Sequence, residues 1–271
     1  MRIIGLVAAS AFAIACAIDV LGAAAQQGTV QPSPAQAAAQ TQQPASAPTP
    51  AVDREALAAL QRMGAYLRTL QSFEVQTNTT IDMVMAEDGQ KLQFDGTGLY
   101  RVRRPNAFFI EQRTDRRHRQ YFYDGSTFTV YSPRMHYYAQ VAAPGTIIET
   151  INLAEERYNV FLPLTDLFYW GTPEDESENI TSAQHVGFAR VGDVAADHYA
   201  FRQGDVDWQI WIQRGERSLP LKIVITSREI EGEPQFSSLL RWNLNPRFRS
   251  AAFTFTPSGE ARRIQIAANE E

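Results

Sequence analysis

The chain has 271 residues, of which 44% are hydrophobic, and it carries a formal net charge of −5 at pH 7. This mild acidity argues against a protein dedicated to nucleic-acid binding, because such proteins carry concentrated positive charge. Cys16 is the only cysteine. The sequence therefore excludes a disulfide within the chain, a thiolate metal site and a cysteine nucleophile.

The first 25 residues have the pattern of a secretion signal. Arg2 supplies a positive charge, an uncharged apolar run covers Ile3 to Ile18, and the small residues Ala23 to Ala25 precede Gln26. The run is shorter than the roughly 20 residues that a membrane-spanning helix needs. We therefore expect residues 1–25 to be a signal peptide cleaved after Ala25, and the mature protein to be periplasmic.

Cys16 leaves a second outcome open. Small residues precede it, as they do at a cysteine that becomes lipid-modified, although a leucine is usual where Ala13 stands. Lipidation at Cys16 would make the protein membrane-anchored, whereas cleavage after Ala25 would discard the thiol. We favour cleavage after Ala25.

Residues 26–52 are predicted to be a disordered linker. Gln26 to Ala51 consist almost wholly of Gln, Ala, Pro, Ser and Thr, without charged or aromatic side chains. Such a segment buries too little apolar surface to offset the entropy of folding, and its prolines make it a semi-extended tether. The remaining residues, 53–271, are long enough for one sizeable core.

The folded region begins with a predicted amphipathic helix. Asp53 is a good N-cap residue, and apolar or small residues then recur at three- and four-residue steps from Leu57 to Leu70. At Ser72 the period changes to two, which indicates strands. Six are predicted in the first half: Phe73–Met85, Leu92–Val102, Ala107–Thr114, Gln120–Tyr123, Phe128–Tyr131 and Met135–Val141.

The second half begins with two predicted helices, Thr146–Tyr158 and Leu162–Trp170, and an acidic surface loop follows. Six more strands are then predicted: Gln184–Val191, Ala195–Arg202, Val206–Ile212, Leu221–Arg228, Phe236–Leu244 and Ala252–Thr256. Short connections favour antiparallel pairing, and a sheet of about a dozen strands must curl. We therefore predict an α+β fold, a large curved antiparallel half-barrel with helices packed on its concave face.

Catalytic motifs are missing from the sequence. The four histidines have no ligand spacing, and neither a G-x-S-x-G elbow nor a phosphate-binding loop occurs. We expect no enzyme activity, no cofactor and no metal. Aromatic residues, in contrast, are abundant on the predicted strands, and a concave sheet closed by helices is suited to apolar ligands.

Two stretches of the chain form distinctive motifs, Gly96 to Phe108 and Asp124 to Pro133. The first resembles the second-strand signature, and the second resembles the following hairpin, of the LolA/LolB superfamily of periplasmic lipoprotein carriers. The chain departs from the carrier in its long tether, its extra length and its acidic loop, Glu174 to Glu178. It looks closer to an uncharacterised periplasmic branch beside LolA and LolB than to the carrier itself.

The resemblance implies an apolar cavity under a helical lid. It implies that Arg104 bonds to backbone groups of the lid and that Phe108 lies at the entrance. Period-two faces add a predicted lining, and the residues expected in it are Ile81, Met83, Phe94, Tyr100, Tyr121 and Trp208.

Two functions of different classes follow. The first is a monomeric, non-enzymatic carrier of a hydrophobic ligand, an acylated lipid or lipoprotein. The second is an envelope module that docks or senses a protein partner and fills the cavity with its own side chains. An open apolar cavity of several hundred Å³, roughly the size of small-molecule pockets, favours the carrier. No nucleic-acid partner is expected.

Overall fold

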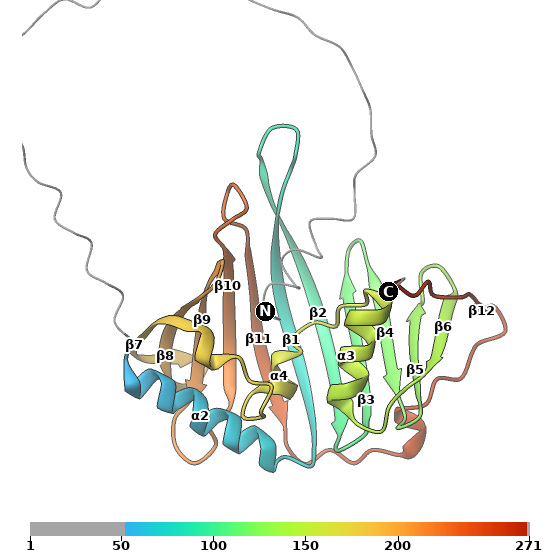
Figure 1. Ribbon diagram of the computed structural model, residues 1–271, viewed down its shortest axis with the longest axis horizontal. Helices are drawn as coiled ribbons and strands as arrows, with labels where there is room; N and C mark the ends of the chain where they lie inside the picture. Colours follow the sequence, from blue (N-terminus) through green and yellow to red (C-terminus); the bar gives the residue numbers. More distant parts are fainter. Residues whose placement is uncertain (1–51, 270–271) are drawn as a thin grey trace, which may run out of the picture.

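Residues with alternating apolar side chains form one twelve-stranded sheet in the computed structural model, which describes residues 52–269 (Figure 1). The predicted signal peptide, Cys16 and the predicted linker before Val52 lie outside the described residues. The strands are β1 (Ser72–Val84), β2 (Lys91–Arg103), β3 (Ala107–Thr114), β4 (His118–Tyr123), β5 (Thr127–Ser132), β6 (Tyr137–Ala142), β7 (Ile180–Val191), β8 (Val194–Gln203), β9 (Val206–Gln213), β10 (Pro220–Ser227), β11 (Gln235–Asn243) and β12 (Arg262–Arg263).

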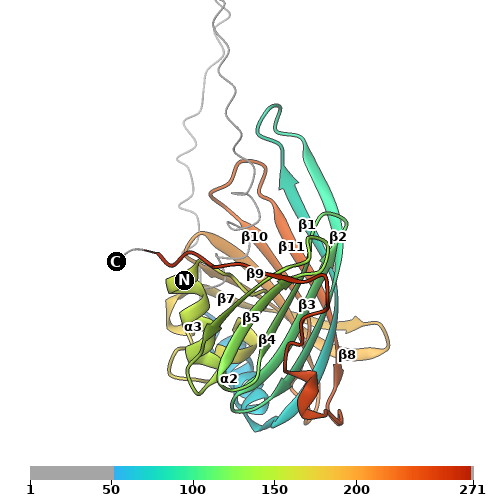
Figure 2. The ribbon, with the colours of Figure 1, turned by 90° about the vertical axis from the view of Figure 1, so that its right-hand side faces the viewer.

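The strand order is β12-β6-β5-β4-β3-β2-β1-β11-β10-β9-β8-β7. Neighbours pair antiparallel except for the short β12, which runs parallel to β6. The two edges do not meet, and the sheet curves round the helices, which lie on one side of it (Figure 2). The predicted curved half-barrel is therefore confirmed, and most predicted strands lie within a few residues of the observed ones.

The first helix, α2 (Arg54–Thr69), forms as its sequence predicts. The Asp53 side chain accepts a hydrogen bond from the Glu55 backbone N–H at 2.8 Å, which caps the helix N-terminus. Its small and apolar face is buried, and the helix crosses the concave side of the β7 to β11 half of the sheet (Figure 1).

The second helix, α3 (Ile147–Tyr158), covers β3 and β4 on the same side (Figure 1). Thr146 is its N-cap, and the Thr146 side chain pairs with both the backbone N–H and the carboxylate of Glu149. Asn159 ends the helix in the left-handed conformation, with φ 50°.

The predicted helix over Leu162–Trp170 is wrong in extent. Only one turn is helical, α4 (Asp166–Tyr169). Pro163 disfavours helical geometry at the residue before it, and Leu164 has a left-handed backbone, with φ 52°. The apolar residues that suggested a helix are nevertheless buried, so they serve packing rather than helix formation.

The predicted strand Ala252–Thr256 is also wrong. Residues 250–252 form a short 3-10 turn, and the chain then crosses the convex face of the sheet. Phe253 packs there with Ala107 and Phe109 of β3, while the Phe255 ring lies 5.3 Å from that of Phe122. Alternation of Phe and Thr therefore reflects contact with this aromatic patch and not strand pairing.

Candidate functional site

The concave face carries a first transverse row of apolar side chains that runs through six strands. In the strand register Phe94 pairs with Ile81, Ile81 with Phe236 and Phe236 with Ile225. Ile225 then pairs with Trp208, and Trp208 with Phe201. Because directly paired residues point to the same face, the register brings Ile81, Phe94 and Trp208 into one row; their contact with a ligand stays a prediction.

A second row crosses the other half of the sheet. Val75 pairs with Tyr100, Tyr100 with Ile110, and Ile110 with Tyr121. Both tyrosines are buried, and burial raises the pKa of each hydroxyl above its ordinary value. The predicted lining residues thus share the concave face but belong to two rows, one on each half of the sheet.

Residues 162–170, here called the lid segment, cover the concave face. Phe168 has 1% of its surface exposed, and its ring centroid lies 6.4 Å from that of Phe108. Phe108 also contacts Tyr123 and Phe128 and is fully buried. In this conformation Phe108 lies in the core beneath the lid segment and does not border an opening. Its contribution to ligand entry stays a prediction.

The Arg-Pro-Asn motif meets α3 through its backbone. The Ile147 N–H at the start of α3 donates to the Pro105 carbonyl at 3.1 Å. Asn106 lies against Gly125. A Cβ added to Gly125 would lie 2.8 Å from the Asn106 amide nitrogen, and the φ angle of Gly125 is +100°. The two motifs that resemble the carrier family therefore touch each other, and together they position the start of α3.

Arg104 lies just after β2, and its backbone N–H donates to Gln71 at 2.8 Å. Its side-chain Nε is buried and has no hydrogen-bond partner among the described residues. Burial, and secondarily the charge of Arg68, lower the pKa of the guanidinium to about 10. The lid bonds that the resemblance implies for this side chain stay a prediction.

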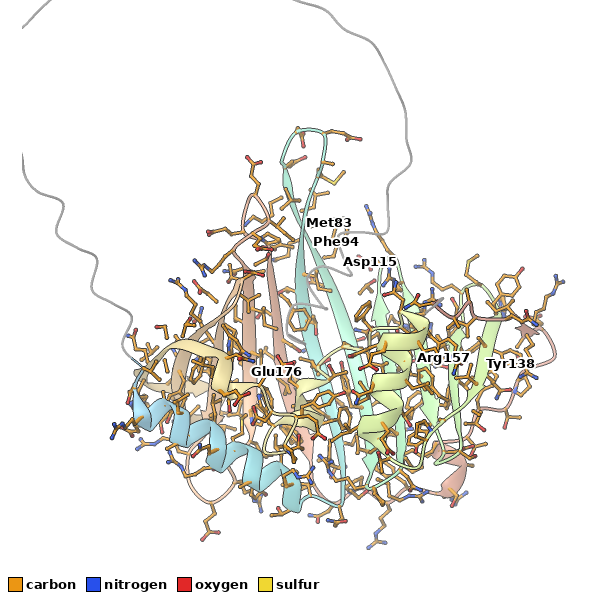
Figure 3. All side chains as sticks on the ribbon, in the orientation of Figure 1. Met83, Phe94, Asp115, Tyr138, Arg157 and Glu176 are labelled. Atoms are coloured by element: carbon orange, nitrogen blue, oxygen red, sulfur yellow. The ribbon has the colours of Figure 1, made fainter. Side chains whose placement is uncertain are left out.

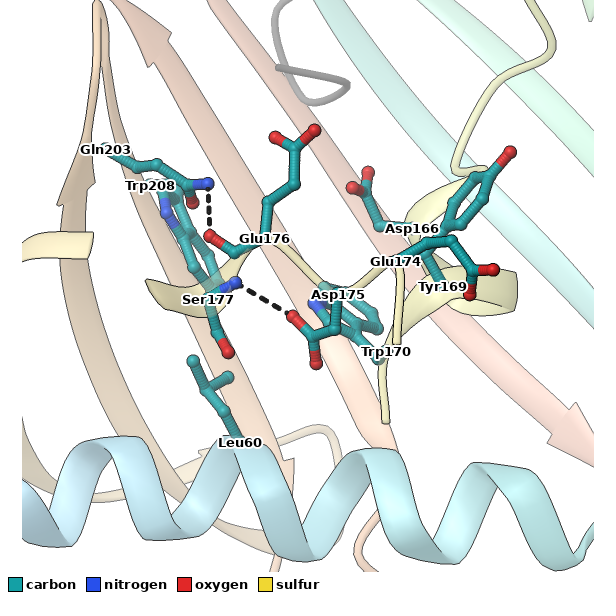
Figure 4. A pocket seen from close by; sticks show the side chains of 10 residues that line it. All are labelled: Leu60, Asp166, Tyr169, Trp170, Glu174, Asp175, Glu176, Ser177, Gln203 and Trp208. Atoms are coloured by element: carbon teal, nitrogen blue, oxygen red, sulfur yellow. Dashed lines mark hydrogen bonds between the residues drawn. The ribbon is translucent and has the colours of Figure 1, made fainter. Parts of the chain in front are cut away.

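A small cavity lies between the lid segment and β8–β9 (Figure 4). Its volume is about 30 Å³, which suffices for water. The acidic loop closes it, because Gln203 Nε2 donates to the Glu176 carbonyl at 2.9 Å and Asp175 accepts from Ser177 and Gly171. Trp208 lines the cavity, and its buried indole N–H has no partner among the described residues.

The apolar lining continues beyond the helices onto a projecting hairpin. Pairing of β1 with β11 ends at Ile81, and pairing of β2 with β3 ends at Gly96, so the outer parts of β1 and β2 pair only with each other. Met83 and Phe94 occupy neighbouring rows there (Figure 3). Their side chains are partly exposed, and the Arg116 guanidinium lies 4.5 Å from the centre of the Phe94 ring.

Sequence reasoning missed the contact between α2 and the lid segment. An added Cβ at Gly64 would lie 2.7 Å from the backbone nitrogen of Gly171, which has φ +74°. Only a residue without a side chain allows so close an approach. Gly64 interrupts the leucine pattern of the predicted helix, and that interruption was the available signal.

Within residues 52–269 no cluster of three or more His, Cys, Asp or Glu side chains has an arrangement that holds a metal ion. No helix in the same range is long and apolar enough to cross a membrane.

Comparison with known protein families shows to which family the chain belongs. The profile of the family described as "Predicted periplasmic protein (DUF2092)" matches residues 56–267. The chain belongs to this family. The expectation of an uncharacterised periplasmic family is thereby confirmed. No curated protein sequence matches the chain significantly.

Solved structures with a similar course of the chain have low sequence identity. An uncharacterized conserved protein from Thermus thermophilus is 9% identical, with 78% of this chain and 99% of that chain covered and a TM-score of 0.44. LprF from Mycobacterium bovis is 11% identical, with 79% and 100% covered and a TM-score of 0.41. The LolA superfamily protein NE2245 from Nitrosomonas europaea is 10% identical, with 74% and 97% covered and a TM-score of 0.35.

Proposed function

We propose that this DUF2092 protein is a non-enzymatic periplasmic carrier of a hydrophobic ligand, an acylated lipid or lipoprotein. One observation carries the proposal. On the concave face an apolar row runs from the buried Trp208, Ile225 and Phe236 to the partly exposed Ile81 and Phe94 on the hairpin. A soluble domain with such a lining presents hydrocarbon-compatible surface along the whole path from solvent to core.

The lid segment is the element that moves. It has a single helical turn, and it occupies the concave face with Leu162, Leu164, Leu167 and Phe168, all of which are buried. A bound acyl chain replaces the contacts that these side chains give up, so opening exposes little apolar surface to water. A ligand shifts the lid only by the difference between its affinities for the open and closed states.

Hydrogen bonds before and within the lid segment limit its motion. The start of α3 is held by the Pro105 carbonyl, and the Tyr123 hydroxyl donates to the Pro144 carbonyl just before that helix. Within the lid, Tyr169 donates to the Asn152 side chain of α3 at 2.7 Å. These bonds favour an opening in which the lid segment swings away from the sheet while the start of α3 stays in place.

A second candidate function is an interaction module for an envelope protein. The observation that favours it is the filling of the concave face by Phe168 and its neighbours, which leaves a cavity of only about 30 Å³ beside Trp208. In this alternative the lid segment is permanent core, and a partner docks on the outside. The two candidates differ in whether an apolar probe displaces the lid.

Binding of the neutral fluorescent probe N-phenyl-1-naphthylamine to the full chain tests the proposal. Phe168→Ala removes a lid side chain, and Phe253→Ala is the matched control, because Phe253 is equally buried but lies on the convex face. Each substitution is expected to cost about 3–5 kcal/mol of stability. Wild type should bind the probe, Phe168→Ala more tightly, and Phe253→Ala like wild type. Absence of binding by all three proteins would reject the carrier.

A further inference from the structure

Strands β10 and β11 separate at one end, which opens a groove in the sheet. Their pairing stops at Lys222 and Leu239, whereas β11 stays paired with β1 as far as Asn243. β10 instead stays with β9 to its first residue, Pro220, after a register shift. The strands therefore diverge, and a groove of about 630 Å³ lies between them.

Much of the wall of this groove is apolar, and Gln213, Asn243 and Asn245 are its uncharged polar members. Leu219, Leu221, Leu240 and Trp242 come from the diverging strands, and Val191 and Val194 come from the turn between β7 and β8. Figure 2 shows that this turn extends to the convex side, away from the helices. The volume of the groove falls within the roughly 300–1,000 Å³ of small-molecule sites. The groove therefore lies where the sheet opens at one end, outside the part that the lid segment covers, and its inner wall belongs to the concave face, because Leu240 pairs with Thr77 and Trp242 with Val75.

The charge of its lining distinguishes the groove from the small cavity under the lid segment. Arg217 and Arg241 border it, and no carboxylate is among its lining residues. Both arginines are exposed. In contrast, the small cavity under the lid segment is bordered by acidic side chains, among them Glu174 and Asp175. Two guanidinium groups beside an apolar slot, in a chain of net charge −5, fit an anionic head on a hydrocarbon chain.

The backbone at the groove is less suited to an added peptide strand. Trp242 Nε1 donates to the Pro220 carbonyl at 2.7 Å, and the Gln213 N–H donates to the Leu219 carbonyl at 2.8 Å. The carbonyls at the start of β10 are thus already bonded, and strand addition relies on such free groups. A hydrocarbon chain needs none of them.

We propose that the groove between β10 and β11 is a second binding site, and that it holds a single-chain fatty acid whose carboxylate meets Arg217 and Arg241. The proposal rests on the proposed function for the hydrophobic class of its ligand, but its site is different. Hydrocarbon lies against the leucines and Trp242, and the two arginines hold the charged end at the rim.

Titration of the full chain with parinaric acid, a fluorescent 18-carbon fatty acid, and with its uncharged methyl ester tests this site. The double variant Arg217→Glu, Arg241→Glu should weaken binding of the acid at least about tenfold and leave the ester nearly unchanged. The control Arg262→Glu, Arg263→Glu makes the same charge change on exposed residues of β12, an edge strand far from the groove in the strand order. This control should bind both probes like wild type.

A second pair of variants tests the apolar wall. Val194→Trp narrows the groove and should weaken both probes, whereas Val186→Trp makes the same change at an exposed residue that does not line it. Equal binding of parinaric acid by all variants would overturn the site. Arginine-dependent binding of lysophosphatidylglycerol without binding of the fatty acid would overturn the carboxylate assignment, and preferential binding of a Leu/Glu peptide would overturn the lipid assignment. Failure of the carrier proposal is separate, since it shows as loss of N-phenyl-1-naphthylamine binding.

Discussion

The close contact between Gly64 and Gly171 leads us to predict that Gly64→Ala lowers the stability of the protein, the opposite of its usual effect in a helix. In an exposed helix this substitution stabilises by about 1 kcal/mol, because alanine is the better helix former. Here the new methyl group would lie 2.7 Å from Gly171 N, 2.9 Å from Gly171 Cα and 3.0 Å from the Trp170 carbonyl carbon. All three atoms are backbone, so no side chain can turn aside. Overpacking of this kind costs about 1–3 kcal/mol, and we expect a net loss of about 1 kcal/mol.

Urea denaturation of the full chain, followed by circular dichroism, measures this change. Gly145→Ala is the control, because an added Cβ there has no neighbour within 4 Å, and it should be neutral or slightly stabilising. If the lid segment yields rather than the fold, Gly64→Ala should also bind N-phenyl-1-naphthylamine more tightly. A Gly64→Ala protein that is more stable than wild type by about 1 kcal/mol would refute the close contact of α2 with Trp170 and Gly171.

Three further predictions concern single groups. Arg104→Met should change the free energy of unfolding by less than about 1 kcal/mol, since the buried Nε has no partner to lose; a larger loss in urea denaturation would support the lid bonds that the resemblance implies. Hydrogen bonds from Arg202 lower the pKa of Asp207, so the stability that this carboxylate contributes is present above its unfolded pKa and is lost as pH falls. Asp207→Asn should therefore be less stable than wild type by a few tenths of a kcal/mol near about pH 6, and the two proteins should become equally stable in acid. Free energies of unfolding that differ by the same amount at every pH would contradict this. Deletion of residues 269–271 removes two hydrogen bonds that Asn269 donates to the last turn of α3; hydrogen exchange should rise in that turn, and unchanged protection would show that the bonds contribute nothing.

Local sequence signals predicted the fold well wherever one strand follows another. Alternation from Phe73 onward and the Asp124-Gly125 turn depend on near neighbours in the chain, and the corresponding strands formed. Asp53 and Thr146 marked helix starts for the same reason.

Elsewhere tertiary packing determined the outcome. The Phe253 and Phe255 side chains alternate like a strand, yet they pack on aromatic rings from strands far away in the sequence. The lid segment has the composition of a buried helix, but its burial requires only apolar side chains and not helical backbone. Divergence of β10 from β11 leaves no signal in either strand, because each one still pairs with its other neighbour.

The candidate site shows the same division. Period-two alternation placed Tyr100, Tyr121 and Trp208 on strands with apolar faces, but only the register between strands separates them into two rows. Phe168, which covers Phe108, was not among the predicted site residues because it lies in a segment predicted as helix, whereas the predicted lining was taken from alternation on strands.

Mass spectrometry of lipids that co-purify with the full chain, isolated without detergent from its native envelope, tests the central claim most directly. The carrier account predicts acyl lipid in near-stoichiometric amount, and less of it with Met83→Glu, which places a charge on the apolar path along the hairpin. Lipid-free protein that also fails to bind N-phenyl-1-naphthylamine would contradict the account and favour the interaction module.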